Sequence, residues 1–188
     1  MPRRVSFRPA LSLRGRPSMG LRGFAGKPFH PPLTDIPIGA YVLAAAFDLV
    51  SWIWASQEWS RDFYRAATFA LIGGAVVSLG TALTGFLDWY RSAPKGTQAR
   101  RTASAHGLTM ATVTVLVLAD IGIRLASYSE PSVPAGIAVL TIVVAAMTAL
   151  GATIGGSLVY DYGFNVQTAR DSAVWHRSEQ DVMPGQKG

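Results

Sequence analysis

The sequence has 188 residues, of which 49% are hydrophobic and only 15% are charged, and its formal net charge is +6. A soluble domain has about 25% charged residues, so this composition favours a membrane protein, and the positive charge indicates a membrane surface rather than a nucleic-acid partner. The absence of cysteine excludes disulfides, thiol catalysis, and iron–sulfur or zinc sites that need cysteine ligands.

The leading segment, residues 1–34, contains several arginines and no acidic residue. It lacks the apolar core of a secretory signal peptide. We expect a basic, disordered cytoplasmic arm that lies against anionic lipid headgroups. An organellar transit peptide, which has the same acid-poor composition, is the alternative.

Four segments approach or exceed the roughly 20 apolar residues needed to cross a bilayer. They are approximately Ile36–Ser56, Ala66–Leu87, His106–Ser127 and Pro134–Val159. The second and fourth have no charge between their ends, as expected for helices in lipid. The predicted fold class is therefore all-α: an integral membrane four-helix bundle over residues 35–163, followed by a polar cytoplasmic tail at 164–188.

The basic residues predict the orientation of this bundle. Fourteen of the seventeen Lys and Arg residues lie in the leading segment, the connection between the second and third spans, and the tail. The positive-inside rule then places both termini in the cytoplasm, an N-in/C-in topology.

Two stretches of the sequence are similar, "GTALTGFLDWY" from Gly80 and "GATIGGSLVYDY" from Gly151. Each has glycines five residues apart, Gly80 and Gly85 in one and Gly151 and Gly156 in the other. This similarity suggests two helical hairpins in the same orientation, related by an axis along the membrane normal. Small residues available for close helix packing are Gly80, Gly85, Gly151, Gly155 and Gly156.

The hairpin interpretation gathers polar residues at the cytoplasmic end of the bundle, because two spans begin there and two end there. The inner-rim cluster that we expect comprises His30, Asp35, Asp88, His106, Tyr160 and Asp161. Structural or solvated pairing of these groups is the favoured interpretation, and a ligand site is the alternative.

Three ionisable residues lie within the spans: Asp48, Asp120 and Arg124. Intramembrane charges usually face the bundle interior in pairs. Asp120 and Arg124 are four residues apart, which suits contact along one helix face, and Asp48 can join them from the first span. A structural salt-bridge network is the first interpretation and a proton or ion relay is the second.

No catalytic signature is present: the sequence has no Walker motif, no H-E-x-x-H, no G-x-S-x-G and no dinucleotide fingerprint. We therefore expect no enzyme activity, assign no catalytic residue, and assign no metal site.

A series of motifs does resemble a known family. In order they are "HPPLTDIPIG" from His30, "TGFLDW" from Thr84, the histidine at 106, and "GGSLVYDYG" from Gly155. Over about Phe29–Val166 the chain resembles bacterial four-helix integral membrane proteins grouped as a domain of unknown function. Some members are linked to Rieske-type iron–sulfur domains. The resemblance implies a fold and a bacterial cytoplasmic membrane, with Met110 and Ser157 standing where relatives often have asparagine and histidine.

Three functions follow as hypotheses. The first is an accessory or structural subunit, associated with itself or with other membrane subunits of a larger, redox-linked assembly, as the Rieske link of relatives implies. The second is an electron-transfer protein that holds b-type haem or a metal between His30 and His106. The third is a small proton- or ion-handling transporter that uses Asp48 and Asp120.

Overall fold

A computed structural model describes residues 28–166, and in this range the chain folds into four α-helices. They are α1 (His30–Ile53), α2 (Ser60–Ser92), α3 (Gln98–Ala126) and α4 (Ala135–Tyr160). Each is long and apolar enough to cross a membrane. The predicted all-α, four-span fold is thus confirmed. Most of the basic arm predicted at 1–34 and of the tail predicted at 164–188 lies outside the described residues.

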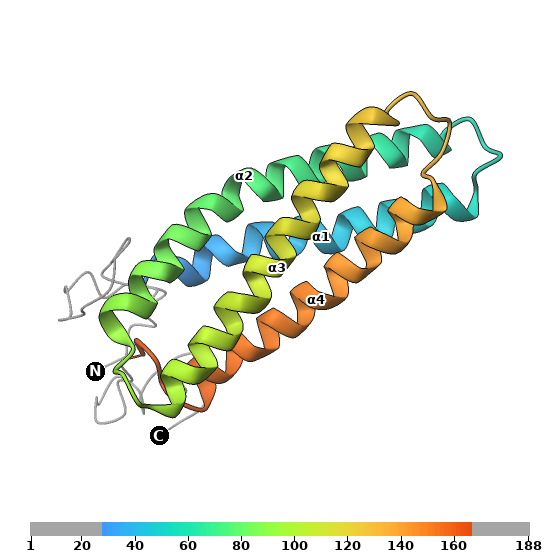
Figure 1. The fold of residues 1–188 in the computed structure, drawn as a ribbon. Helices are drawn as coiled ribbons and strands as arrows, with labels where there is room; N and C mark the ends of the chain where they lie inside the picture. Colours follow the sequence, from blue (N-terminus) through green and yellow to red (C-terminus); the bar gives the residue numbers. More distant parts are fainter. Residues whose placement is uncertain (1–27, 167–188) are drawn as a thin grey trace, which may run out of the picture.

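The helices run up and down along one axis as two adjacent hairpins (Figure 1). α1 pairs with α2 and α3 pairs with α4, while α1 also packs on α4 and α2 on α3. The α1–α2 and α3–α4 connections lie at one end of the bundle (Figure 1). The α2–α3 connection lies at the other end, together with the start of α1 and the end of α4. We call this second end the terminal end.

The first helix begins earlier than the hydrophobic pattern predicts, at His30 rather than Ile36. No side chain caps this helix, and the Thr34 hydroxyl donates to the Pro31 carbonyl. Prolines in the first turn explain the difference, since their missing N–H groups need no cap there.

A third proline, Pro37, lies inside α1 and cannot donate to the carbonyl of Leu33, one turn before it. The hydroxyl of Thr81 on α2 lies 3.3 Å from that carbonyl oxygen and 3.2 Å from the Val77 carbonyl oxygen of its own helix. Its single proton can supply the missing donor when the hydroxyl turns from Val77 to Leu33.

The polarity of the bundle is reversed relative to a soluble protein. Large apolar side chains point outward, for example Phe69, Leu79 and Val115, which are 63–65% exposed. The interior combines a central apolar cluster around Tyr41, Leu71 and several small residues with buried threonines, serines and charges. This arrangement suits a hydrocarbon environment, where apolar surface costs nothing and polar groups must find partners inside.

The N-in/C-in orientation stays a prediction, and reporter fusions test it. A fluorescent protein fused after residue 188 or inserted near Lys95 is expected to fluoresce, because it folds in the cytoplasm. An alkaline phosphatase inserted at Gln57 is expected to be active, because it requires the opposite compartment. Phosphatase activity at Lys95 together with inactivity at Gln57 would reverse the topology.

Candidate functional site

Two histidines meet inside the terminal end of the bundle. His30 is the first residue of α1 and His106 lies on α3, and the centroids of their rings are 6.2 Å apart with planes nearly perpendicular at 83°. Both side chains are partly buried. They come from diagonally opposite helices, because α1 packs on α2 and α4 but makes no comparable contact with α3 within the described residues.

Each imidazole is held by the other helix of its own hairpin. His30 Nδ1 lies 3.0 Å from the Thr81 carbonyl oxygen, and His106 Nδ1 lies 2.8 Å from the Gly151 carbonyl oxygen. A carbonyl can only accept, so both Nδ1 atoms must carry the proton and donate. In the neutral form of each ring, Nε2 is then an acceptor with a lone pair.

A glycine makes room for each ring, four residues after the acceptor carbonyl. A Cβ at Gly85 would lie 2.6 Å from His30 Cε1, and a Cβ at Gly155 would lie 3.0 Å from His106 Cε1. Both hairpins thus have an acceptor carbonyl followed one turn later by a glycine that contacts the ring. This structural match makes Gly85 equivalent to Gly155, whereas the sequence similarity makes Gly85 equivalent to Gly156.

This register corrects two predicted packing glycines. A Cβ at Gly80 would have nothing within 4 Å, and a Cβ at Gly156 would meet only Tyr160 of its own helix, at 3.9 Å. Gly151 does face α3, where a Cβ would collide with the sulfur of Met110. The error has a simple cause, since one residue of shift rotates a helical position by about 100°.

The other predicted inner-rim residues differ in exposure. Asp88 is buried, at 6% exposure, and it does have an interaction partner. Asp35 and Asp161 are exposed, and Tyr160 is 88% exposed. Asp35 follows His30 by five residues, which places it about 140° around the helix from that ring. Within residues 28–166 no group of three or more His, Asp or Glu residues could hold a metal ion.

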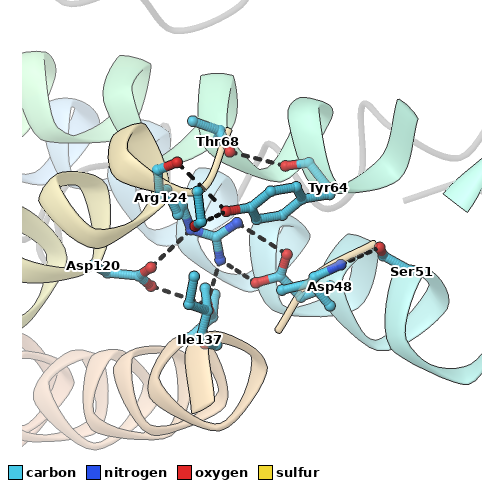
Figure 2. A network of polar contacts seen from close by, with 10 residues as sticks. Asp48, Ser51, Tyr64, Thr68, Asp120, Arg124 and Ile137 are labelled. Carbon is cyan, nitrogen blue, oxygen red and sulfur yellow. Dashed lines mark hydrogen bonds and ion pairs between the residues drawn. The ribbon is translucent and has the colours of Figure 1, made fainter. Parts of the chain in front are cut away.

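A second polar site lies near the opposite end of the bundle, centred on Arg124 (Figure 2). Its Nε donates to Asp120 Oδ1 at 2.7 Å, its Nη1 donates to Asp48 Oδ1 at 3.1 Å, and its Nη2 donates to Asp48 Oδ2. Nη2 also donates to Thr141 Oγ1 at 2.6 Å. The guanidinium carbon lies 5.3 Å from the centroid of the Tyr64 ring. All five side chains are fully buried.

The ion pair joins equivalent positions of the two hairpins. Asp48 follows His30 by eighteen residues, and Arg124 follows His106 by eighteen. The structure thus places an acid and a base at matching positions, so the two halves are complementary rather than identical.

Sequence reasoning missed one partner in each site. The Thr141 hydroxyl bridges Arg124 and Asp120, and the backbone carbonyl of Thr81 anchors His30. A signal was present in α2, where Ser78, Thr81 and Thr84 recur every three residues and lie on the buried side. Such a polar stripe in an otherwise apolar span indicates the interior face.

A family model described as "Predicted membrane protein (DUF2231)" matches residues 26–168, the four helices and both polar sites included. The chain belongs to this family. No curated protein and no solved structure matches it. Membership in DUF2231 therefore agrees with a polytopic membrane protein, and it assigns no activity to either polar site.

Proposed function

We propose that this DUF2231 protein binds a b-type haem between His30 and His106 and acts as an electron-transfer subunit in the membrane. One observation carries the proposal: both imidazoles donate through Nδ1 to backbone carbonyls, which leaves two Nε2 lone pairs on rings 6.2 Å apart. Metal-ligating histidines almost always have such an outer partner on the other nitrogen.

The donor set favours haem over a bare metal ion. Two imidazoles are too few for a structural zinc site, which takes four protein ligands. They are the donor set that a haem iron takes from a protein, so His30 and His106 would hold the haem through their imidazoles. Without cysteine the chain has no C-x-x-C-H motif for covalent attachment, so the haem would be of the b type.

The geometry also argues against a purely structural pair. Two neutral imidazoles that both donate through Nδ1 present only acceptors to each other, so they cannot hydrogen bond directly. Each Nε2 therefore needs a partner other than the second imidazole, either water or a bound ligand. Bound haem would supply one-electron chemistry, while Thr81 and Gly151 hold the ligand rings in one tautomer and orientation.

Absorption spectroscopy tests the proposal. The detergent-purified protein from haem-replete cells is expected to show a Soret band and a low-spin bis-imidazole spectrum with stoichiometric iron. His30→Ala and His106→Ala are each expected to lose that spectrum. His176→Ala, which removes the third histidine of the chain, is expected to keep it. A colourless protein without iron would overturn the proposal.

The setting that we propose is the bacterial cytoplasmic membrane, with the basic arm against anionic lipid headgroups and other membrane subunits, or a second copy, as partners. An accessory role in a redox assembly, which the resemblance implies, is compatible with a bound haem. Co-purification from mild detergent with a stoichiometric membrane partner supports it, and recovery of only the lone chain opposes it.

A further inference from the structure

The Arg124 network contains an odd number of charges. Asp48 and Asp120 are both carboxyl groups, Arg124 is the only base in contact with them among the described residues, and none of the three side chains is exposed. Tyr64 from α2 and Thr141 from α4 are the other groups that face it, and neither supplies a positive charge. With both acids ionised, a net negative charge would be buried at membrane depth, which is costly.

We infer that Asp120 binds a proton on Oδ2 in the folded protein, so that the network is one ion pair plus one neutral carboxylic acid. This proton site does not depend on the proposed haem. It gives Asp48 and Asp120, which are both intramembrane aspartates in the sequence, different protonation states.

The hydrogen bonds identify which carboxyl holds the proton. Both oxygens of Asp48 accept from the guanidinium, which leaves no oxygen there for a proton without loss of an ionic contact. Asp120 Oδ1 likewise accepts from Arg124 Nε. Asp120 Oδ2 is the one carboxyl oxygen of the network that faces a hydroxyl instead, at 2.9 Å from Thr141 Oγ1.

The Thr141 hydroxyl has a single proton and can therefore donate only one hydrogen bond. That oxygen accepts from Arg124 Nη2 and lies 2.9 Å from both Asp120 Oδ2 and the Ile137 carbonyl oxygen. It can donate to only one of the two. If it donates to Ile137, then a protonated Oδ2 donates to Thr141, and every group has a partner. If Asp120 is ionised, Thr141 must turn to it and the buried charge stays uncompensated.

The test compares two identical substitutions. Asp120→Asn is expected to shift the melting temperature in detergent by no more than about 2–4 °C, because an amide reproduces a protonated carboxyl: its oxygen accepts from Arg124 and its NH2 donates to Thr141. Asp48→Asn is expected to lower it by about 10 °C or more, because Arg124 loses its bidentate carboxylate and Asp120, which contacts it through one oxygen only, must ionise to replace that charge. Asp161→Asn, at an exposed position, is the neutral control.

Infrared spectroscopy provides a readout that does not depend on stability. At neutral pH the wild-type protein and Asp161→Asn are expected to show a carboxylic-acid C=O band, which Asp120→Asn removes. Absence of that band from the wild type, its persistence in Asp120→Asn, or equal destabilisation by Asp120→Asn and Asp48→Asn would each overturn the inference. Neither readout requires bound haem, so failure of this inference and failure of the proposed function can be distinguished.

Discussion

Replacement of Arg124 by glutamine is expected to destabilise the folded protein by about 3–5 kcal/mol, the range found when one partner of a buried ion pair is removed. The guanidinium makes all the ionic contacts of the buried network, to Asp48 and to Asp120. Without it, the Asp48 carboxylate remains buried with no counter-ion. Unfolding of the purified protein in mixed micelles, followed by helical circular dichroism, measures the loss.

Two further variants make this result specific. Arg61→Gln removes a guanidinium that donates to the Ser129 and Glu130 carbonyls at an exposed connection, and it is expected to cost less than about 1 kcal/mol. Arg124→Gln combined with Asp48→Asn removes the buried charge altogether and is expected to recover most of the loss, giving a large coupling energy. Equal effects of Arg124→Gln and Arg61→Gln would contradict a network that holds α1, α3 and α4 together.

Substitution of Gly85 by alanine is expected to cost about 1–3 kcal/mol, as overpacking of a buried contact does. The new Cβ would stand 2.6 Å from Cε1 and 2.9 Å from Nδ1 of His30. The ring cannot move away freely, because Nδ1 is anchored on the Thr81 carbonyl. Relief of the clash therefore breaks that bond and displaces Nε2, so haem retention is expected to fall along with stability.

Gly80→Ala is the matched control for this substitution. It lies on the same helix, five residues earlier, with nothing within 4 Å of the added carbon. There the change is expected to be neutral or to stabilise α2 by up to about 1 kcal/mol, because alanine has the higher helix propensity. The two variants should thus differ in sign. A neutral Gly85→Ala with unchanged haem content would show that the His30 ring is not confined by α2.

The sequence alone predicted the number of helices and the position of each membrane span. The reason is that membrane spanning is a local requirement: about 20 apolar residues must satisfy their own backbone hydrogen bonds. The predicted spans omit the polar ends of the helices. For example, α2 begins at Ser60, whereas the predicted span begins at Ala66. Helical hydrogen bonding continues past the apolar stretch, so hydropathy marks the lipid-embedded part rather than the helix.

The sequence also singled out the residues of both polar sites, because histidines and charges are rare in such helices and stand out. Which of them meet was decided by the tertiary structure. In a lipid-embedded bundle the outer face is as apolar as the inner one, so periodicity does not identify the face that points inward. For example, Gly155 contacts the His106 ring, whereas Gly156, one residue later, faces away from it. Only the packed helices showed that Asp48 pairs through both oxygens with Arg124 while Asp120 turns one oxygen to Thr141.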